Sequence, residues 1–160
     1  MTRSTGIALF LFAPFLALGQ GGDAQVRAQA DQLFAEQRFA EAMPLYSQLV
    51  SLTPKDRNLN YRLGACMLFG AAAKEQSIGH LKFATEAPDT DPIAWYWMGR
   101  AYHLNYHFKE AQVAYQRFLG TADKKTLAAW PVEALQRQCR NGEKLLSSLK
   151  EITVRNKVEV

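Results

Sequence analysis

The chain has 160 residues, of which 48% are hydrophobic and 21% are charged, and its formal net charge at pH 7 is +4. This composition is typical of one folded globular domain and argues against an intrinsically disordered chain. The positive charge is too small to predict a nucleic-acid partner.

The chain begins with a short apolar segment. Arg3 precedes an apolar run from Ile7 to Leu18, and the small residues Ala17 and Gly19 lie at its end. This pattern predicts a secretory signal peptide over residues 1–19, cleaved after Gly19. The alternative is an uncleaved anchor, although the run is short for a membrane span. No Cys follows the run, which excludes a lipoprotein anchor. Because of the signal-peptide pattern, we expect an exported protein.

Two helices are predicted between residues 23 and 56. Ala30 and Leu33 mark the first helix, and Phe39 opens the second. Pro44 falls near the first turn of the second helix, where its missing amide hydrogen costs least. We therefore expect a helical hairpin with Pro44 inside its second helix.

The same pattern returns over residues 57–91 and 92–125. The small residues Ala30, Gly64 and Gly99 stand 34 and 35 residues apart. Equal spacing of this kind indicates an internal repeat. Three helical hairpins are therefore predicted.

The middle hairpin is the least regular. From Gly64 to Ser77 is 13 residues, whereas the corresponding step from Gly99 to Ala111 is 12 residues. One extra residue is therefore expected in the turn of this hairpin, near Gly70, because glycine tolerates the backbone conformations of turns.

The third hairpin is the most regular. Its large apolar and small residues recur at three- and four-residue steps on each helix: Trp95, Met98, Gly99 and Tyr102, then Ala111, Tyr115 and Phe118. This spacing resembles the tetratricopeptide repeat, a helix-turn-helix unit of roughly 34 residues. Met98, Phe118 and Asp123 depart from the usual signature. The resemblance implies an all-α fold over residues 20–150, a right-handed superhelical solenoid of three hairpins and a capping helix.

The capping helix is expected at about residues 131–149. Val132 and Leu135 begin a row of apolar residues with helical spacing, opposite charged residues. A solenoid leaves the apolar side of its last hairpin uncovered, so this helix should contact Tyr115 and Phe118.

The last residues change period. Ile152, Val154 and Val158 alternate with polar residues, which is typical of a strand. Residues 151–160 are therefore expected to be a frayed tail or the first strand of a further domain.

The sequence offers little for catalysis. Cys66 and Cys139 are expected on helices more than one repeat apart, so we predict two separate thiols. His103 and His107 are four residues apart, but the helix should end near Asn105 and no carboxylate lies between them, so no metal site is predicted. Nucleophile motifs, phosphate-binding glycine loops and dinucleotide fingerprints are missing. We expect no enzyme, no cofactor and no small-molecule substrate.

The tetratricopeptide resemblance implies a concave groove lined by the first helix of each hairpin. The residues projected into it are Arg27, Asp31, Phe34, Asn58, Tyr61, Ala65, Leu68, Phe69, Ile93, Tyr96, Arg100 and His103. Aromatic residues with Arg are typical of protein-binding surfaces. The alternative is that Phe34, Leu68 and Phe69 pack inside the solenoid. Ile93 and Trp97 replace the basic residues that a clamp for a terminal carboxylate would need.

The arrangement as a whole also resembles the N-terminal part of cell-envelope proteins of Bacteroidota, some of which belong to gliding motility and type IX secretion machinery. In those proteins a β-propeller and an OmpA-like peptidoglycan-binding domain follow. The resemblance implies a periplasmic or outer-membrane-associated adaptor that binds a protein or an extended peptide. The alternative is a structural spacer that positions a C-terminal envelope domain.

Overall fold

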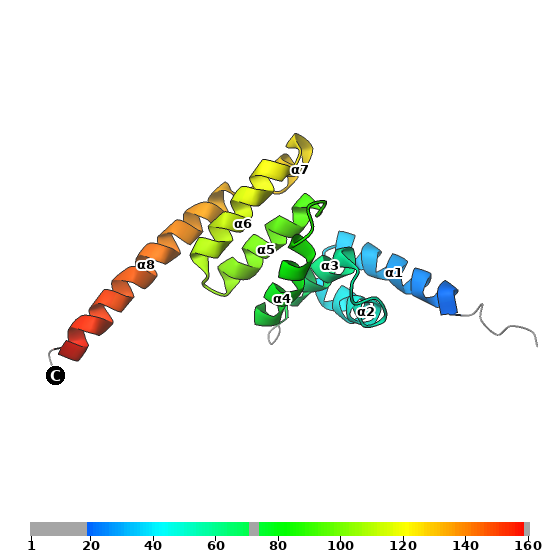
Figure 1. Ribbon diagram of the computed structural model, residues 1–160, viewed down its shortest axis with the longest axis horizontal. Coiled ribbons are helices and arrows are strands. Elements are labelled where there is room, and N and C mark those ends of the chain that lie inside the picture. Colours follow the sequence, from blue (N-terminus) through cyan, green and yellow to red (C-terminus); the bar gives the residue numbers. More distant parts are fainter. Residues whose placement is uncertain (1–18, 71–73, 159–160) are drawn as a thin grey trace, which may run out of the picture.

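The structure, a computed structural model, describes residues 19–70 and 74–158. Within these ranges the chain forms eight α-helices and no strand. They are α1 (Gly19–Ala35), α2 (Phe39–Leu52), α3 (Arg57–Met67), α4 (Lys74–Thr85), α5 (Pro92–Leu104), α6 (Phe108–Thr121), α7 (Lys124–Ala129) and α8 (Glu133–Val158). Figure 1 shows the molecule from α1 at the right to α8 at the left, with α7 at the top beside the end of α6.

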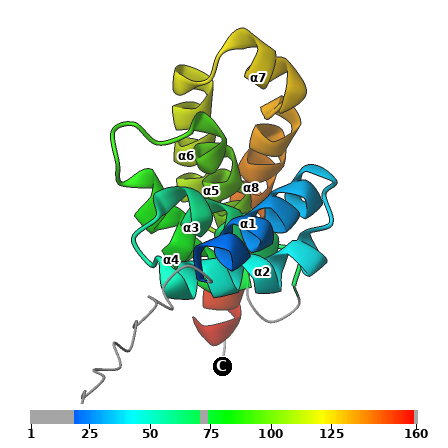
Figure 2. The ribbon, with the colours of Figure 1, turned by 90° about the vertical axis from the view of Figure 1, so that its right-hand side faces the viewer.

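Six helices pair into three hairpins. α1 packs on α2, α3 on α4, and α5 on α6, while α2 also packs on α3 and α4 on α5. Figure 2 looks along this stack from the α1 end, with α8 behind. Each hairpin buries one face against the next, which is the quasi-linear packing of a solenoid. The predicted all-α class and the three hairpins are therefore confirmed.

Aspartates start three of the helices. The side chain of Asp56 accepts a hydrogen bond from the backbone N–H of Leu59 at 3.0 Å, and Asp91 and Asp123 cap α5 and α7 in the same way. An aspartate at this position satisfies an amide that has no partner within the helix. The helix starts are therefore determined locally, by one residue each.

The short hairpin turns use an unusual backbone conformation. Gln37, between α1 and α2, has a φ angle of 59°, and Tyr106, between α5 and α6, has 63°. Residues other than glycine occupy this left-handed region at a cost of about 1–2 kcal/mol. The connection from α3 to α4 is longer, and residues 71–73 of it lie outside the described ranges. The extra residue expected near Gly70 belongs to this connection.

The N-terminal half differs from expectation in two details. α1 begins at Gly19 rather than at residue 23. Pro44 lies in the second turn of α2 rather than the first. Its missing amide leaves the carbonyl of Ala40 without a helical partner, and Ala40 is exposed, so water can bind there.

The signal peptide predicted over residues 1–19 lies almost wholly outside the described ranges. None of the described helices has the length and apolar character needed to cross a membrane.

The helices of the C-terminal part differ more from the prediction than those of the N-terminal half. The short helix α7 was not predicted, and α8 starts at Glu133 rather than at residue 131. α8 then continues to Val158, so the strand or frayed tail predicted for residues 151–160 is wrong as far as Val158. Extending an existing helix satisfies the backbone hydrogen bonds, whereas a lone strand leaves them unpaired. Ile152 also continues the helical spacing of Leu145.

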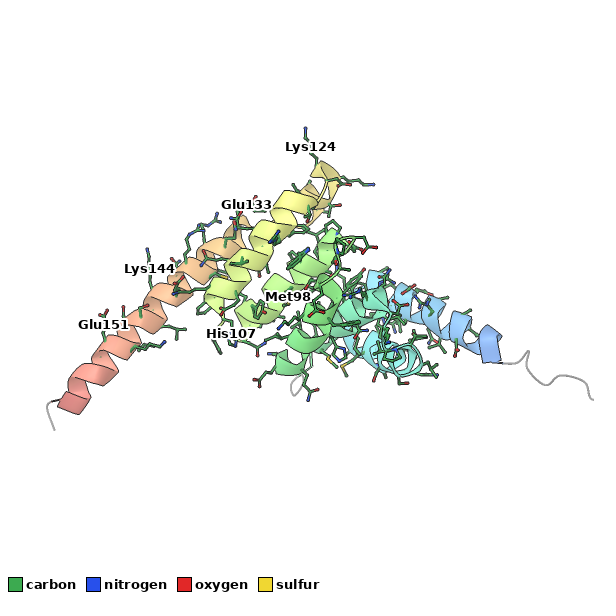
Figure 3. All side chains as sticks on the ribbon, viewed as in Figure 1. Met98, His107, Lys124, Glu133, Lys144 and Glu151 are labelled. Atoms are coloured by element: carbon green, nitrogen blue, oxygen red, sulfur yellow. The ribbon has the colours of Figure 1, made fainter. Side chains whose placement is uncertain are left out.

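The first part of α8 caps the stack by packing on α6. Phe118 of α6 and Val132, just before α8, are both buried. A Cβ atom at Gly142 would lie 2.4 Å from the Phe108 ring, so the glycine lets this ring pack closely where the two helices touch. The second part of α8 runs past the hairpins, and Figure 3 shows Lys144 and Glu151 on it.

Candidate functional site

Aromatic side chains fill the inner side of the stack, where the first helices of the hairpins lie. The indole of Trp97 is at the centre, with ring centroids 6.3 Å from Phe34, 5.6 Å from Phe39, 6.1 Å from Phe69 and 5.6 Å from Trp130. We call Phe34, Phe39, Tyr61, Phe69, Tyr96, Trp97 and Trp130 the inner aromatic cluster. Its ring contacts join the first hairpin directly to the third.

Most of these contacts are edge-to-face, the arrangement in which aromatic quadrupoles attract. Phe34 contacts Phe39 at 5.3 Å and 80°, and Tyr96 contacts Trp130 at 4.8 Å and 63°. Ala65 of α3 and Leu68, just after α3, are both buried.

The cluster changes the predicted groove. Tyr61 and Tyr96 were expected to face a ligand, yet they are only 5% and 8% exposed. Phe34 and Leu68 pack inside the solenoid, as the alternative proposed. Phe69 packs inside the solenoid and also faces solvent. Its ring stacks on Phe39 at a centroid distance of 4.3 Å, while 51% of the residue stays exposed. The physical reason is that rings of the three hairpins contact one another and fill the space where a ligand was expected.

The predicted polar residues of the first hairpin are engaged in ion pairs. Arg27 donates to Asp56 at 2.9 Å. Asp31 accepts from the Tyr46 hydroxyl at 2.7 Å and from the guanidinium of Arg62. These pairs join α1 to the start of α3 and to α3 itself, so Arg27 and Asp31 are not free to orient a ligand. Arg62 was missed, because the only signal for it was its place beside Tyr61.

The remaining predicted residues keep some surface. Asn58 is exposed, while Ile93, Arg100 and His103 are half-buried. The guanidinium of Arg100 lies 3.4 Å from the Tyr96 hydroxyl. Burial, and then the charge of Arg100, lower the pKa of His103, so this imidazole is neutral at physiological pH. These four residues therefore keep part of the surface of the predicted site accessible to a ligand.

Asp56 stabilises the fold twice, as helix cap and as ion-pair partner. Burial alone would raise the pKa of Asp56, but hydrogen bonds from Arg27 and from the backbone N–H of Leu59 hold it below its ordinary value. Replacing Asp56 with Ala should lower the free energy of unfolding by about 1 kcal/mol at neutral pH.

Because the folded-state pKa is depressed, this stabilisation is present above the unfolded pKa of about 3.9 and is lost as the pH falls through the folded pKa. Urea unfolding of the wild type and the Asp56→Ala variant should therefore differ at neutral pH and converge in acid. Asp89→Ala is the control, since Asp89 is exposed and caps no helix. A difference that does not change with pH would contradict the assigned role.

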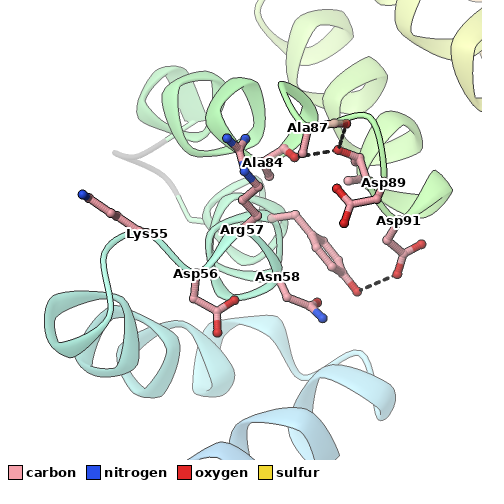
Figure 4. Close-up of a pocket in the computed structure, with 11 residues that line it drawn as sticks. Lys55, Asp56, Arg57, Asn58, Ala84, Ala87, Asp89 and Asp91 are labelled. Carbon is pink, nitrogen blue, oxygen red and sulfur yellow. Dashed lines mark hydrogen bonds between the residues drawn. The ribbon is translucent and has the colours of Figure 1, made fainter.

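A cleft opens at the starts of α3 and α5 (Figure 4). It has a volume of about 470 Å³, and we call it the α3–α5 cleft. Its lining is Lys55, Asp56, Arg57, Asn58, Tyr61, Ala84, Ala87, Asp89, Thr90, Asp91 and Ala94. Only Asn58 and Tyr61 had been predicted as site residues. Most of the others lie on connections between hairpins, where helical periodicity carries no information, while Arg57, Ala84 and Ala94 lie in the first or last turn of a helix.

Internal hydrogen bonds hold the walls of the cleft. The Tyr61 hydroxyl donates to Asp91 at 3.5 Å, and the Thr90 hydroxyl is 2.9 Å from the carbonyl oxygen of Ala84. Arg57 donates to the backbone carbonyl of Phe83 and lies 4.7 Å above its ring. By contrast, Lys55, Asn58 and Asp89 are exposed, and no hydrogen bond or ion pair engages their side chains within the described part of the chain. Figure 4 shows Lys55 and Asp89 on opposite sides of the cleft.

The His and Cys side chains considered for chemistry are separated or buried in the described part of the chain. No group of three or more His, Cys, Asp and Glu side chains in residues 19–70 and 74–158 could hold a metal ion. α5 ends at Leu104, so His103 and His107 do not share a helix. Cys66 and Cys139 are buried and unbonded, as predicted, and burial raises the pKa of the Cys66 thiol to about 12. Such a thiol is a poor nucleophile at neutral pH.

Comparison with known proteins supports the fold. No family model matches the sequence, and a comparison with curated proteins found no match. Among solved structures, the chain is similar to the crystal structure of the Sgt2 TPR domain from Aspergillus fumigatus, with a TM-score of 0.56 and 16% identity. The match covers 81% of this chain and 82% of that chain. The chain therefore has the fold of a tetratricopeptide repeat domain.

Proposed function

We propose that this chain is a non-catalytic adaptor of the bacterial cell envelope that binds an extended segment of a partner protein in the α3–α5 cleft. One observation carries the proposal: free polar groups of Lys55, Asn58 and Asp89 surround a floor where Tyr61 and Asp91 already pair. A floor held in this way needs little further ordering when a peptide binds, which favours affinity.

The chemistry of the cleft suits a peptide of mixed character. The Asn58 amide can both donate to and accept from a peptide backbone. Asp89 and Asp91 lie on one side of the cleft, where they attract a Lys or Arg of the partner (Figure 4). Lys55, on the other side, attracts an acidic group. At the far end of α3, the exposed half of the Phe69 ring offers an apolar contact.

The N-terminal segment supports the proposed cellular location. Residues 1–19 have the pattern of a signal peptide, so we place the mature chain in the periplasm or at the outer membrane. Its partner is then an envelope protein, with association to the outer membrane or to a secretion machinery. The net charge of +4 gives no support to a nucleic-acid partner.

A phage-displayed peptide library selected on the purified chain tests the adaptor. The enriched peptides should carry a basic side chain and bind the wild type. Their affinity for the Asn58→Ala, Asp89→Lys double variant should fall about tenfold or more, measured by isothermal titration calorimetry.

The matched control is Asn141→Ala with Glu133→Lys, which makes the same change in net charge at exposed positions of α8. This control should bind like the wild type. Peptides that bind the cleft variant and the wild type equally would contradict the cleft assignment, provided that both proteins have the same helicity by circular dichroism.

A second candidate function is a structural spacer that positions a C-terminal envelope domain. It is favoured by α8, which continues past the α5–α6 hairpin (Figure 1). Leu145 and Ile152 on this part of α8 are 62% and 54% exposed. Apolar side chains at these positions would be covered by a following domain. A library selection that enriches no peptide would favour the spacer over the adaptor.

A further inference from the structure

A second depression lies on the other side of α5, away from the inner aromatic cluster. It has a volume of about 330 Å³, and we call it the outer furrow. Its lining is Lys82, Thr85, Glu86, Trp95, Met98, Tyr102, Glu110, Val113 and Ala114. At about 100° per residue, Trp95, Met98 and Tyr102 fall on the face of α5 roughly opposite Tyr96 and Trp97. The outer furrow and the inner side of the stack are therefore separate surfaces.

The floor and one wall of the outer furrow are apolar. Met98 and Ala114 are buried at its base, and Trp95 and Tyr102 are half-buried. Val113 is 63% exposed, so an apolar side chain on the wall stands in water. An apolar side chain of a partner could cover Val113 and the floor together, which would remove apolar surface from water.

The rim of the outer furrow is predominantly acidic. Glu86 and Glu110 are exposed carboxylates, and Lys82 is the single cation among the lining residues. Within the described part of the chain, no ion pair engages any of these three side chains. Burial, and then the negative charge of Glu110, raise the pKa of the Tyr102 phenol, so a carboxylate lies near the apolar floor. The unpaired charge of this surface is negative.

We propose that the outer furrow docks a segment of a second partner protein, one that inserts an aliphatic or aromatic side chain beside a Lys or Arg. The apolar floor takes the inserted side chain, because its burial removes apolar surface from water. Glu86 and Glu110 attract the neighbouring cation and repel an acidic segment, which sets specificity. The volume is at the low end for small-molecule sites, and it suits one or two side chains. The proposal does not depend on the α3–α5 cleft.

Two synthetic peptides test the furrow with the purified chain. Both carry a fluorescent label and a central Leu-Phe pair, which is flanked by lysines in one peptide and by glutamates in the other. Fluorescence anisotropy at physiological ionic strength should show about tenfold tighter binding of the lysine peptide. Equal binding of both peptides, or no binding of either, would overturn the proposal.

Charge reversal at the rim gives the sharpest test. In the Glu86→Lys, Glu110→Lys double variant, the preference between the two peptides should reverse. The control is Glu75→Lys with Glu133→Lys, which makes the same net charge change at exposed helix starts outside the furrow. A preference that reverses equally in the control would mean that net charge, rather than this surface, selects the peptide, and it would overturn the proposal.

Apolar insertion is tested separately. Val113→Asp should abolish binding of the lysine peptide, whereas Leu52→Asp, at a similarly exposed apolar residue of α2, should not. A second copy of the chain is the competing occupant, since Leu145 lies beside Lys144 on α8. Sedimentation that shows self-association of the wild type, lost in Val113→Asp, would assign the furrow to that copy and overturn the proposal.

Discussion

Replacing Trp97 with Ala is expected to lower the free energy of unfolding by about 3–5 kcal/mol, the range for truncating a buried indole. Trp97 is 3% exposed and contacts rings of the first hairpin, of the third hairpin and of the segment before α8. Its loss therefore opens a cavity where three parts of the chain meet. Urea unfolding followed by circular dichroism measures the effect.

Two further variants test whether the stability loss comes from the buried packing of Trp97 or from losing any Trp of this helix. Trp95, in the same helix, is half-buried, so Trp95→Ala should cost much less than Trp97→Ala. Trp97→Phe should also cost less, because it keeps a ring in the cluster. Trp97→Phe also removes the indole N–H, which is buried without a hydrogen-bond partner among the described residues. Such a buried donor destabilises the folded state by about 1–3 kcal/mol, so its removal offsets part of the loss. Equal losses for Trp95→Ala and Trp97→Ala would contradict the central place of Trp97.

Two glycine substitutions should change stability in opposite directions. A Cβ atom at Gly99 would lie 2.4 Å from Cδ1 and Cε1 of Tyr115, whose ring is fully buried. Gly99→Ala should therefore destabilise the fold by about 1–3 kcal/mol, although Ala has the higher helix propensity. At Gly79, within α4, an added Cβ would meet no atom within 4 Å beyond its chain neighbours and the nearby backbone of the same helix.

Gly79→Ala should accordingly stabilise the fold by about 0.5–1 kcal/mol, because nothing opposes the gain in helix propensity. The midpoints of urea unfolding of the two variants should fall on opposite sides of the wild type. A stabilised Gly99→Ala variant would mean that α5 and α6 are not in close contact at this glycine. The repeat spacing already singled out Gly99, and the packing shows that Gly79 has no comparable neighbour.

The filled inner side has a consequence for recognition. Ligand-facing aromatic residues were predicted on α3 and α5, yet Tyr61 and Tyr96 are buried by other rings of the same chain. These rings form a rigid base instead of an open groove. The free polar groups that remain are at the ends of the helices, in the α3–α5 cleft. Loop residues such as Asp89 carry the candidate site, and no periodic pattern predicts them.

The C-terminal error has a related cause. The alternation from Ile152 to Val158 favours a strand when each residue is considered alone. In the structure α8 is already formed at residue 150, and adding a residue to a helix avoids the cost of nucleation. The alternation of residues therefore predicted the wrong conformation, because the preceding turns of α8 favour continuing the helix.

The sequence by itself determined the fold class, the three hairpins and the separate thiols. These features depend on interactions within one repeat: the aspartate caps, the spacing of apolar residues, and the small residues where helices touch. Only the tertiary structure decided that Phe34 and Trp97 meet, that Arg62 pairs with Asp31, and that acidic side chains border the outer furrow. Those contacts depend on how successive hairpins rotate against each other, and small rotations accumulate along the stack.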